Sequence, residues 1–285
     1  MKEKRIITAA LTGALSPKAV NPNVPVTPEE VADAAYKCWQ EGAAIVHLHM
    51  RDENDIPCCD VELFRESQRL IQEKCDVIIN MTTTTSMKVN AMDTTEAYES
   101  RTQHVIELKP EMCSYDAGSF NWMAADPFCF QNTPQFLSML NEICKEYNVK
   151  PEVEIFDPGM FYVVKWYTDR GLFPGNPHFQ YVTGVMGGLP AEPESIFELE
   201  KHRRKLFPES TWSGFGISKG NLPCLFTALA LGGGVRVGLE DTGFYEKGVM
   251  ADNPMLVARA ARIIREFGCE PATPDEAREM LGLKR

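Results

Sequence analysis

The sequence predicts an α/β protein with the (β/α)8 barrel (TIM barrel) fold, and three observations support this prediction. Short apolar or β-branched runs alternate with helical periods along the whole chain. Eight such pairs fit into about 250 of the 285 residues, a usual length for this fold. Polar and charged residues collect at the C-terminal ends of the predicted strands, where barrel enzymes carry their active sites.

The eight predicted strands are short, and each is followed by turn residues. They span residues 5–13, 43–49, 76–82, 111–117, 151–157, 178–185, 211–217 and 235–240. A doubly wound open sheet is the alternative arrangement for such a pattern. That fold usually has a glycine-rich phosphate turn after its first strand, whereas the turn here, LTGALSP, contains one glycine.

The helices between the strands begin and end with recognisable signals. In the first helix, Thr27 is a typical N-cap, Pro28 takes the first helical position and Gly42 ends the helix. The segment LPCLFTALALGGG is typical of an apolar helix that ends in glycines, and the last helix, TPDEAREMLG, repeats the Thr-Pro start. We therefore expect one barrel domain over residues 1–285, with a short helical extension at about 270–285.

Composition excludes several classes of protein. The net charge of -11 argues against a general nucleic-acid binder, which would need a basic surface. No apolar run approaches the roughly 18 residues of a membrane span, and polar residues interrupt the N-terminal segment that resembles a signal peptide. The nine cysteines lack the spacing of a disulfide framework, which is typical of a reduced, cytoplasmic protein. We therefore expect a cytoplasmic protein that binds small molecules.

The second predicted strand, AAIVHLH, ends in two histidines on the same face. Side chains alternate along a strand, so His47 and His49 point the same way, about 6.5 Å apart. Two imidazoles with one carboxylate suit an open Zn²⁺ site, and Glu240 at the end of the eighth strand is the candidate third ligand. Fe²⁺ or Mn²⁺ would suit the same ligands. The structural alternative is a pair of partly buried histidines that bond to the backbone.

Arg236 and Asp241 form a second candidate pair on the eighth strand. A buried arginine near a metal needs a carboxylate neighbour. Strand alternation puts Arg236 and Glu240 on one face but about 13 Å apart, so a contact requires the length of the arginine or a bend in the strand. The alternative is a structural salt bridge without a catalytic role.

Several long motifs resemble those of the β-keto acid cleavage enzymes, and the likeness extends through nearly the whole chain. The matching segments are TGA (12–14), NPNVPVTPEE (21–30), AAIVHLHMRD (43–52), KPEM (109–112), AGSFN (117–121), PEVEIFD (151–157), GGVRVGLED (233–241) and ATPDEARE (272–279). The resemblance implies a (β/α)8 barrel that forms a homotetramer. It also implies an acyltransferase that exchanges a β-keto acid with acetyl-CoA and produces acetoacetate and a new acyl-CoA.

The family pattern further implies roles for individual residues. His47, His49 and Glu240 are expected to bind one zinc ion, which polarises the keto oxygen and stabilises an enolate. The pair of Arg236 and Asp241 is expected to assist deprotonation of the carbon between the ketone and the carboxylate. The carbanion then attacks the acetyl thioester, and retro-Claisen cleavage by the released CoA thiolate follows.

The substrate-binding positions match the family only in part. Thr82 and Ser114 match hydroxyl positions that are expected to bind the carboxylate of the substrate. Leu15, however, stands where the type member, which cleaves 3-keto-5-aminohexanoate, has an acidic residue for the amino group of its substrate. Asp116 replaces an asparagine of the type member, and Glu154 lies on the next strand. The resemblance therefore implies the reaction but not the tail of the substrate.

Two kinds of substrate tail remain open at this point. Asp116 and Glu154 favour a cationic tail, such as a quaternary ammonium group next to Phe120 or Trp122. A neutral aliphatic tail would instead lie against the apolar side chains of Leu15 and Met186.

Two other functions compete with this interpretation. A metal-dependent hydrolase of the amidohydrolase type also has a His-x-His strand, and Asp241 could be its aspartate ligand. Such enzymes need further histidine or lysine ligands from the middle strands, whereas His178 stands at the start of its strand, at the wrong end of a barrel. A metal-binding scaffold without activity would have no use for an open site beside an arginine–carboxylate pair.

Overall fold

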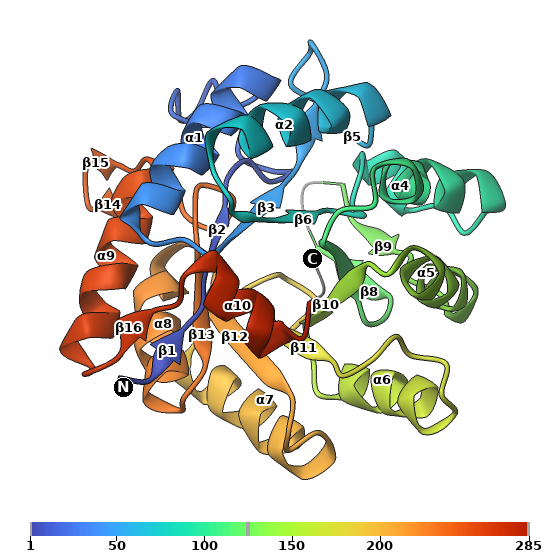
Figure 1. The fold of residues 1–285 in the computed structure, drawn as a ribbon. Coiled ribbons are helices and arrows are strands. Elements are labelled where there is room, and N and C mark those ends of the chain that lie inside the picture. The colour runs from blue at the N-terminus through green and yellow to red at the C-terminus, as the bar shows by residue number, and fades with distance from the viewer. Residues whose placement is uncertain (1, 124–125, 284–285) are drawn as a thin grey trace.

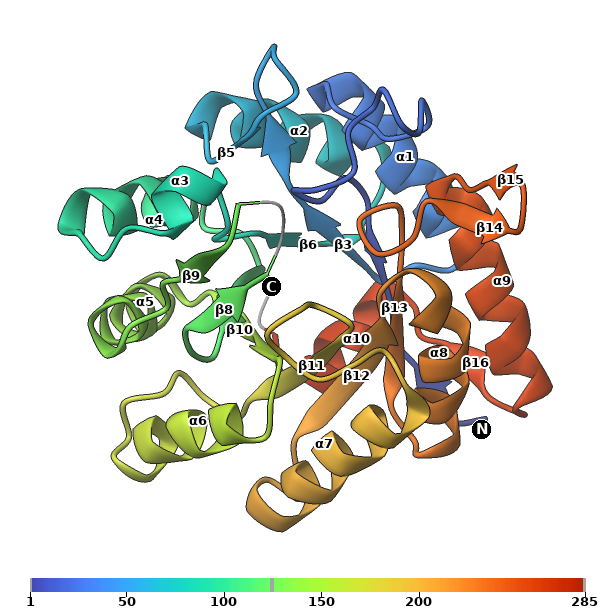
Figure 2. The ribbon, with the colours of Figure 1, turned by 180° about the vertical axis from the view of Figure 1, so that it is seen from behind.

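The computed structural model describes residues 2–123 and 126–283, and its centre is a closed barrel of eight parallel strands. Each strand pairs with its neighbours in chain order, and the last pairs with the first to close the ring (Figures 1 and 2). The barrel strands are β2 (Ile7–Ala10), β3 (Ile45–Leu48), β6 (Ile78–Met81), β7 (Met112–Asp116), β10 (Lys150–Ile155), β11 (His178–Thr183), β12 (Thr211–Gly216) and β13 (Gly234–Val237). This arrangement confirms the predicted (β/α)8 barrel.

Helices surround the barrel and cover the outward faces of its strands (Figure 1). The long helices are α1 (Pro28–Glu41), α2 (Val61–Lys74), α4 (Thr95–Leu108), α5 (Pro134–Tyr147), α6 (Gly159–Asp169), α7 (Pro193–Leu206), α8 (Asn221–Ala230) and α9 (Asn253–Glu266). Two short segments, α3 (Met87–Asn90) and the 3-10 turn η1 (Ser218–Gly220), lie in loops. Within the described ranges, no helix is both long and apolar enough to cross a membrane.

The start of α1 shows how closely the local signals match the structure. Thr27 accepts a hydrogen bond from the amide of Glu30, and the Glu30 side chain returns one to the amide of Thr27. Pro28 occupies the first helical position, and Gly42 ends the helix with a left-handed φ of 111°. α9 begins with a simpler N-cap, in which Asp252 accepts a hydrogen bond from the amide of Met255.

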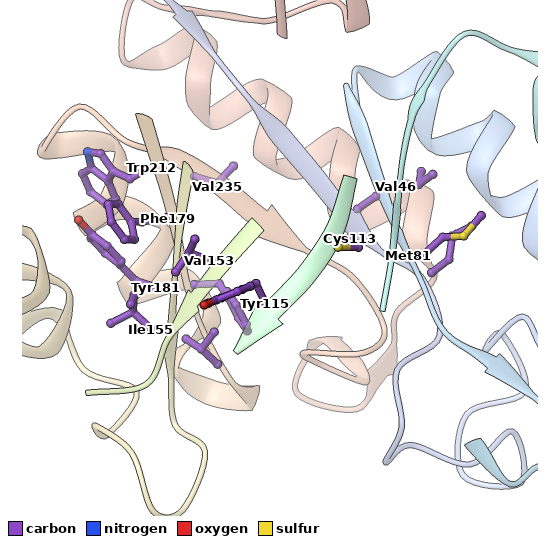
Figure 3. Packing of buried hydrophobic residues seen from close by; sticks show 14 of the residues in the cluster. Val46, Met81, Cys113, Tyr115, Val153, Ile155, Phe179, Tyr181, Trp212 and Val235 are labelled. Carbon is purple, nitrogen blue, oxygen red and sulfur yellow. The ribbon is translucent and has the colours of Figure 1, made fainter. Parts of the chain in front are cut away.

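Alternate residues of each strand point outward and pack against the helices. Figure 3 shows part of this apolar layer, in which the rings of Tyr181 and Trp212 stack with centroids 4.6 Å apart. The inward positions at mid-height carry buried polar side chains instead, namely Thr8, Asn80, Glu152, Gln180 and Ser213. The barrel therefore has an apolar outer layer and a polar interior beneath its C-terminal end.

The eighth strand is shorter than predicted. β13 stops before the predicted end at residue 240, because the chain turns at Gly238 with a φ of 156°. A Cβ at Gly238 would overlap the carbonyl oxygen of Ala10 in β2, so this close approach requires glycine. The amides of Asp241 and Thr242 donate to the Gly238 carbonyl and complete the turn. The bend returns this segment to the mouth of the barrel.

Three antiparallel hairpins that were not predicted lie in the loops after barrel strands (Figure 2). They are β4 (Met50–Arg51) with β5 (Pro57–Cys58), β8 (Phe120–Trp122) with β9 (Phe128–Phe130), and β14 (Phe244–Glu246) with β15 (Val249–Met250). These hairpins follow β3, β7 and β13, so they stand at the C-terminal end of the barrel. They surround the region where the predicted site residues are expected.

The C-terminal segment closes the opposite end of the barrel. β1 (Lys4–Arg5) pairs with β16 (Glu270–Pro271), and α10 (Pro274–Leu281) then lies across the end of the barrel (Figure 1). Apolar residues of α10 pack against the beginnings of the strands. The cluster consists of Ile6, Ala44, Ile45, Ile78, Met112, Ala272, Ala277 and Leu281. One end of the barrel is therefore sealed with apolar side chains, and the polar end is left for chemistry.

Replacing Leu281 with alanine is expected to lower the free energy of unfolding by about 2–4 kcal/mol, because it leaves a cavity beneath the strands. Urea denaturation followed by circular dichroism measures this change. Met280→Ala is the matched control, since Met280 is 39% exposed on the same helix whereas Leu281 is 4% exposed. The control should change the free energy by less than about 0.5 kcal/mol. Equal losses in both variants would contradict the sealing role of α10.

Candidate active site

Two histidines and one carboxylate meet at the C-terminal end of the barrel. His47 belongs to β3, His49 follows that strand directly, and Glu240 lies in the turn after β13. The Nε2 atoms of His47 and His49 lie 3.7 and 3.5 Å from the carboxylate oxygens of Glu240. One ligand atom from each residue lies within 4.8 Å of the other two, so the group forms a candidate metal site.

The backbone around Gly13 determines where Glu240 lies. Gly13 has a φ of 68°, and a Cβ at this position would lie 2.5 Å from Cγ of Glu240. Arg51 donates to the Gly13 carbonyl through Nε at 3.0 Å and through a terminal nitrogen at 2.6 Å. The amide of Glu240 donates to the carbonyl of Ala10 at 3.3 Å. The two loops therefore hold the Glu240 side chain close to the histidines.

The three side chains fit a divalent metal ion. Two atoms that each lie about 2 Å from a shared ion are at most about 4 Å apart, a condition that both histidine–Glu240 distances meet. Burial lowers the pKa of His47 well below its usual value, so its imidazole is neutral and offers a lone pair. Burial opposes the ionised form of Glu240, but the charge of Arg236 and the interactions with the two histidines together outweigh burial and lower the pKa of Glu240 well below its usual range.

Arg236 is a buried guanidinium that faces three carboxylates. It donates to both oxygens of Asp241, at 3.1 and 3.0 Å, and to Glu240 at 2.6 Å. A terminal nitrogen lies 3.6 Å from Glu154, and the guanidinium carbon lies 4.4 Å from the ring centroid of Phe215. Burial acts against this charge, but the three carboxylates raise the pKa of Arg236 well above its usual value. The bend after β13 thus makes the expected arginine–carboxylate contact possible.

Asp116 on β7 and Glu154 on β10 lie side by side on neighbouring strands, and both line the same cavity. Burial raises the pKa of Asp116 to about 6, while the charge of Arg101 opposes this change. Burial, and next the charge of Asp116, raise the pKa of Glu154 well above its usual value. In the layer below, burial raises the pKa of Glu152 to about 7. This part of the cavity would therefore be stabilised by an additional cation.

Aromatic side chains form another wall of the cavity. Phe120 stacks on Phe156 with ring centroids 4.3 Å apart, and on Phe130 at 5.3 Å. Trp122 lies beside Phe120, with centroids 6.2 Å apart. Phe120, Trp122 and Phe130 come from the β8–β9 hairpin, whereas Phe156 follows β10. The hairpin therefore covers the charged residues with a surface that excludes water.

The residues predicted to bind substrate do not all reach the cavity. Four of them line it, namely Leu15, Thr82, Asp116 and Glu154. Ser114 is not among the described residues that line it, and its buried hydroxyl accepts a hydrogen bond from the amide of Thr83 at 2.9 Å. Met186, proposed to contact a neutral tail, is likewise missing from the described lining and is largely exposed. In this structure Ser114 supports the loop after β6.

Sequence reasoning missed two aromatic residues that shape the site. Phe215 lies under the guanidinium of Arg236, and Phe156 stacks against the β8–β9 hairpin. Both lie near the C-terminal ends of predicted strands, which is the signal that could have identified them. The other three histidines, His104, His178 and His202, are not among the described residues that line this cavity. The ring of His104, for example, contacts the carbonyl of Thr82 at 2.8 Å beneath the site.

Comparison with known proteins shows the family of the chain. Residues 4–283 match the profile of the beta-keto acid cleavage enzyme family. The chain belongs to this family. Among its relatives, a 3-keto-5-aminohexanoate cleavage enzyme of Fusobacterium nucleatum is 38% identical over 288 residues, which cover 100% of both chains. A 3-oxoadipate:acetyl-CoA acetyltransferase of Cupriavidus necator is 31% identical over 284 residues, covering 99% of this chain and 96% of that enzyme.

A solved structure supports the fold of this β-keto acid cleavage enzyme. The apo structure of ObcA superposes with a TM-score of 0.78 at 20% sequence identity. The superposition covers 92% of this chain and 66% of the ObcA chain. At this level of identity, the likeness supports the barrel architecture and carries no information about the substrate.

Gly13→Ala is expected to weaken metal binding by about 10- to 100-fold, because the added methyl group collides with the side chain of Glu240. Mass spectrometry of the metal content after dialysis measures this loss. Gly171→Ala is the matched control: Gly171 has nearly the same backbone strain, with a φ of 67°, but nothing lies within 4 Å of its added methyl group. Loss of metal in both variants, or in neither, would show that Gly13 does not position Glu240.

Proposed function

We propose that this enzyme is a zinc-dependent acyltransferase that exchanges a β-keto acid with acetyl-CoA and produces acetoacetate and a new acyl-CoA. The main support is the group formed by buried His47 and His49 and partly buried Glu240, which lies beside the pair of Arg236 and Asp241. Membership of the β-keto acid cleavage enzyme family supports the reaction class. The amidohydrolase-like alternative would use the metal but no acetyl-CoA.

Asp241 is the proposed base. Both of its oxygens accept hydrogen bonds from Arg236, which fixes their orientation. Burial raises the pKa of Asp241 to about 6, against the charge of Arg236. A carboxylate with this pKa is ionised at neutral pH and is a stronger base than an exposed aspartate. It removes a proton from the substrate carbon between the ketone and the carboxylate.

The remaining steps are a Claisen addition and its reverse. The carbanion attacks the carbonyl carbon of acetyl-CoA and expels the CoA thiolate. The thiolate then attacks the original ketone carbon, and the bond from that carbon to the deprotonated carbon breaks. The original acyl group leaves as acyl-CoA. The other fragment takes back the proton from Asp241 and leaves as acetoacetate.

His47, His49 and Glu240 are the proposed zinc ligands, because two imidazole nitrogens and one carboxylate leave a position open for substrate. Bound zinc supplies a Lewis acid for the keto oxygen. Arg236 keeps Glu240 ionised, and the aromatic wall excludes water that would protonate a carbanion.

One assay tests the reaction and the metal together. Zinc-loaded protein is incubated with a panel of β-keto acids, with and without acetyl-CoA, and acetoacetate is measured. We expect acetoacetate only when both substrates are present. His49→Ala and Glu240→Ala are each expected to lose the metal. Their activity should fall by on the order of 10²–10³-fold. Hydrolysis without acetyl-CoA would favour the amidohydrolase-like alternative, and activity that persists without metal would refute the zinc role.

We also propose that the substrate has a cationic tail. An ammonium group between Asp116 and Glu154 would favour their ionised forms, and Phe120 or Trp122 would offer it an aromatic face. The two relatives differ in this respect, since the name of one substrate contains an amino group and the other is a dicarboxylic acid. The acidic residues of this cavity suit the first kind of tail and repel the second.

Asp116→Asn is expected to reduce the preference for a cationic tail by about tenfold, because one charged contact is lost. The measurement compares kcat/KM for 5-amino-3-oxohexanoate and 5-methyl-3-oxohexanoate, in which a methyl group replaces the ammonium. Asp169→Asn on the exposed side of α6 removes the same charge far from the cavity and should leave the preference unchanged. A wild-type enzyme that prefers the methyl compound would contradict the cationic tail.

We further propose that the enzyme is a cytoplasmic homotetramer. All nine cysteines are free thiols, which supports a reducing compartment. Exposed aromatic side chains, including Trp166 on α6 and Phe197 on α7, offer apolar surface for subunit contacts. Light scattering gives the mass in solution, and a monomeric mass would contradict this assembly.

A further inference from the structure

A second cavity lies beside the active site at the same end of the barrel. It is lined by the loop after β12, the start of α8, the β14–β15 hairpin and one residue of α9, and its volume is about 310 Å³. Figure 2 shows where these elements lie in the fold. Three of its side chains are cationic, namely Lys219, Lys247 and Arg259. Glu246 is the acidic residue in its described lining. This local excess of positive charge stands out in a chain with a net charge of -11.

Within the residues that the structure describes, no ion pair joins Lys219, Lys247 or Arg259 to a carboxylate, although the charge of Glu246 in the same lining acts on Arg259. Arg259 stacks over the ring of Tyr245 at 4.3 Å and donates to the Tyr245 carbonyl at 2.6 Å, which orients the guanidinium. Burial lowers the pKa of Arg259, an effect that an anionic partner would offset. The cavity therefore presents an excess of positive charge that Glu246 offsets only in part, and the guanidinium of Arg259 is held in a fixed orientation.

The second cavity and the active site share a wall. Ile217 and Asp241 line the active site, and the residues that follow them, Ser218 and Thr242, line the second cavity. The amide of Ser218 donates to the carbonyl of Asp241 at 2.7 Å, which ties the two segments together. The two cavities are therefore adjacent, as a single ligand that reaches from one to the other would require.

We propose that the second cavity binds the phosphate groups of acetyl-CoA, with Lys219, Lys247 and Arg259 as their partners. This inference rests on the proposed function, because the thioester must reach Asp241 while the highly charged phosphates cannot enter the acidic active site. The pantetheine arm then spans the shared wall. The planar guanidinium suits a phosphate, and the two lysines supply point charges. Barrel enzymes frequently bind phosphate at the loops after their seventh and eighth strands, which are β12 and β13 here.

Adenosine 3′,5′-bisphosphate, which resembles the phosphate-bearing end of CoA, tests this cavity without the reaction. Calorimetry should show that it binds wild-type protein and that salt weakens the binding. The double variant Lys219→Gln/Arg259→Gln should bind at least about tenfold more weakly. Lys37→Gln/Lys165→Gln removes two cations from the outer helices and should bind like wild type. Unchanged binding in the first double variant would overturn the inference.

Two further measurements are needed. One distinguishes CoA from free phosphate as the ligand, and the other distinguishes a failure of the cavity proposal from a failure of the proposed reaction. Inorganic phosphate should not compete with the bisphosphate at equal concentration, and equal affinity would assign the cavity to free phosphate instead of CoA. Acetyl-pantetheine carries the thioester without the phosphates. The double variant should therefore lower the ratio of kcat/KM for acetyl-CoA to that for acetyl-pantetheine by about tenfold. If wild type binds the bisphosphate but forms no acetoacetate, the proposed reaction fails while the nucleotide site stands.

Discussion

The contacts of the buried guanidinium of Arg236 hold the polar end of this barrel together. Asp241, Glu240 and Glu154 all lie within 3.6 Å of it, so one cation stabilises two buried carboxylates and the partly buried Glu240. Leaving such charges unpaired costs about 3–5 kcal/mol. The same cation favours the ionised form of Glu240, which its proposed role as a metal ligand requires, and it orients Asp241. Electrostatic stability and catalytic geometry therefore depend on one side chain.

The barrel makes this arrangement possible by separating its two ends. At the N-terminal end, α10 covers the strands with an apolar cluster that includes Ile45 and Leu281. Above it lies a buried polar layer, in which Asn80 donates to Glu152 at 2.8 Å. The apolar seal keeps water from entering below, so the polar layer faces only the active site. Charges at the C-terminal end consequently act through a medium of low dielectric constant, where they are strongest.

The active-site cavity and the cationic cavity carry side chains of opposite charge. The first cavity places Asp116 and Glu154 beside an aromatic wall, and the second gathers Lys219, Lys247 and Arg259. A cationic acid and an anionic thioester would thus approach one reacting centre from two differently charged sides. Electrostatic complementarity of this kind steers each substrate to its own site.

The sequence by itself determined the barrel, the two histidines and the carboxylate opposite them, because strand periodicity and strand ends are local properties. It could not determine the turn at Gly238, which follows from the close approach of Ala10 on a distant strand. Nor could it show that the Ser114 hydroxyl meets Thr83 instead of the cavity. The aromatic hairpin and the cationic cavity were likewise decided only by the tertiary structure. Both depend on side chains from separate loops that pack together after the barrel closes.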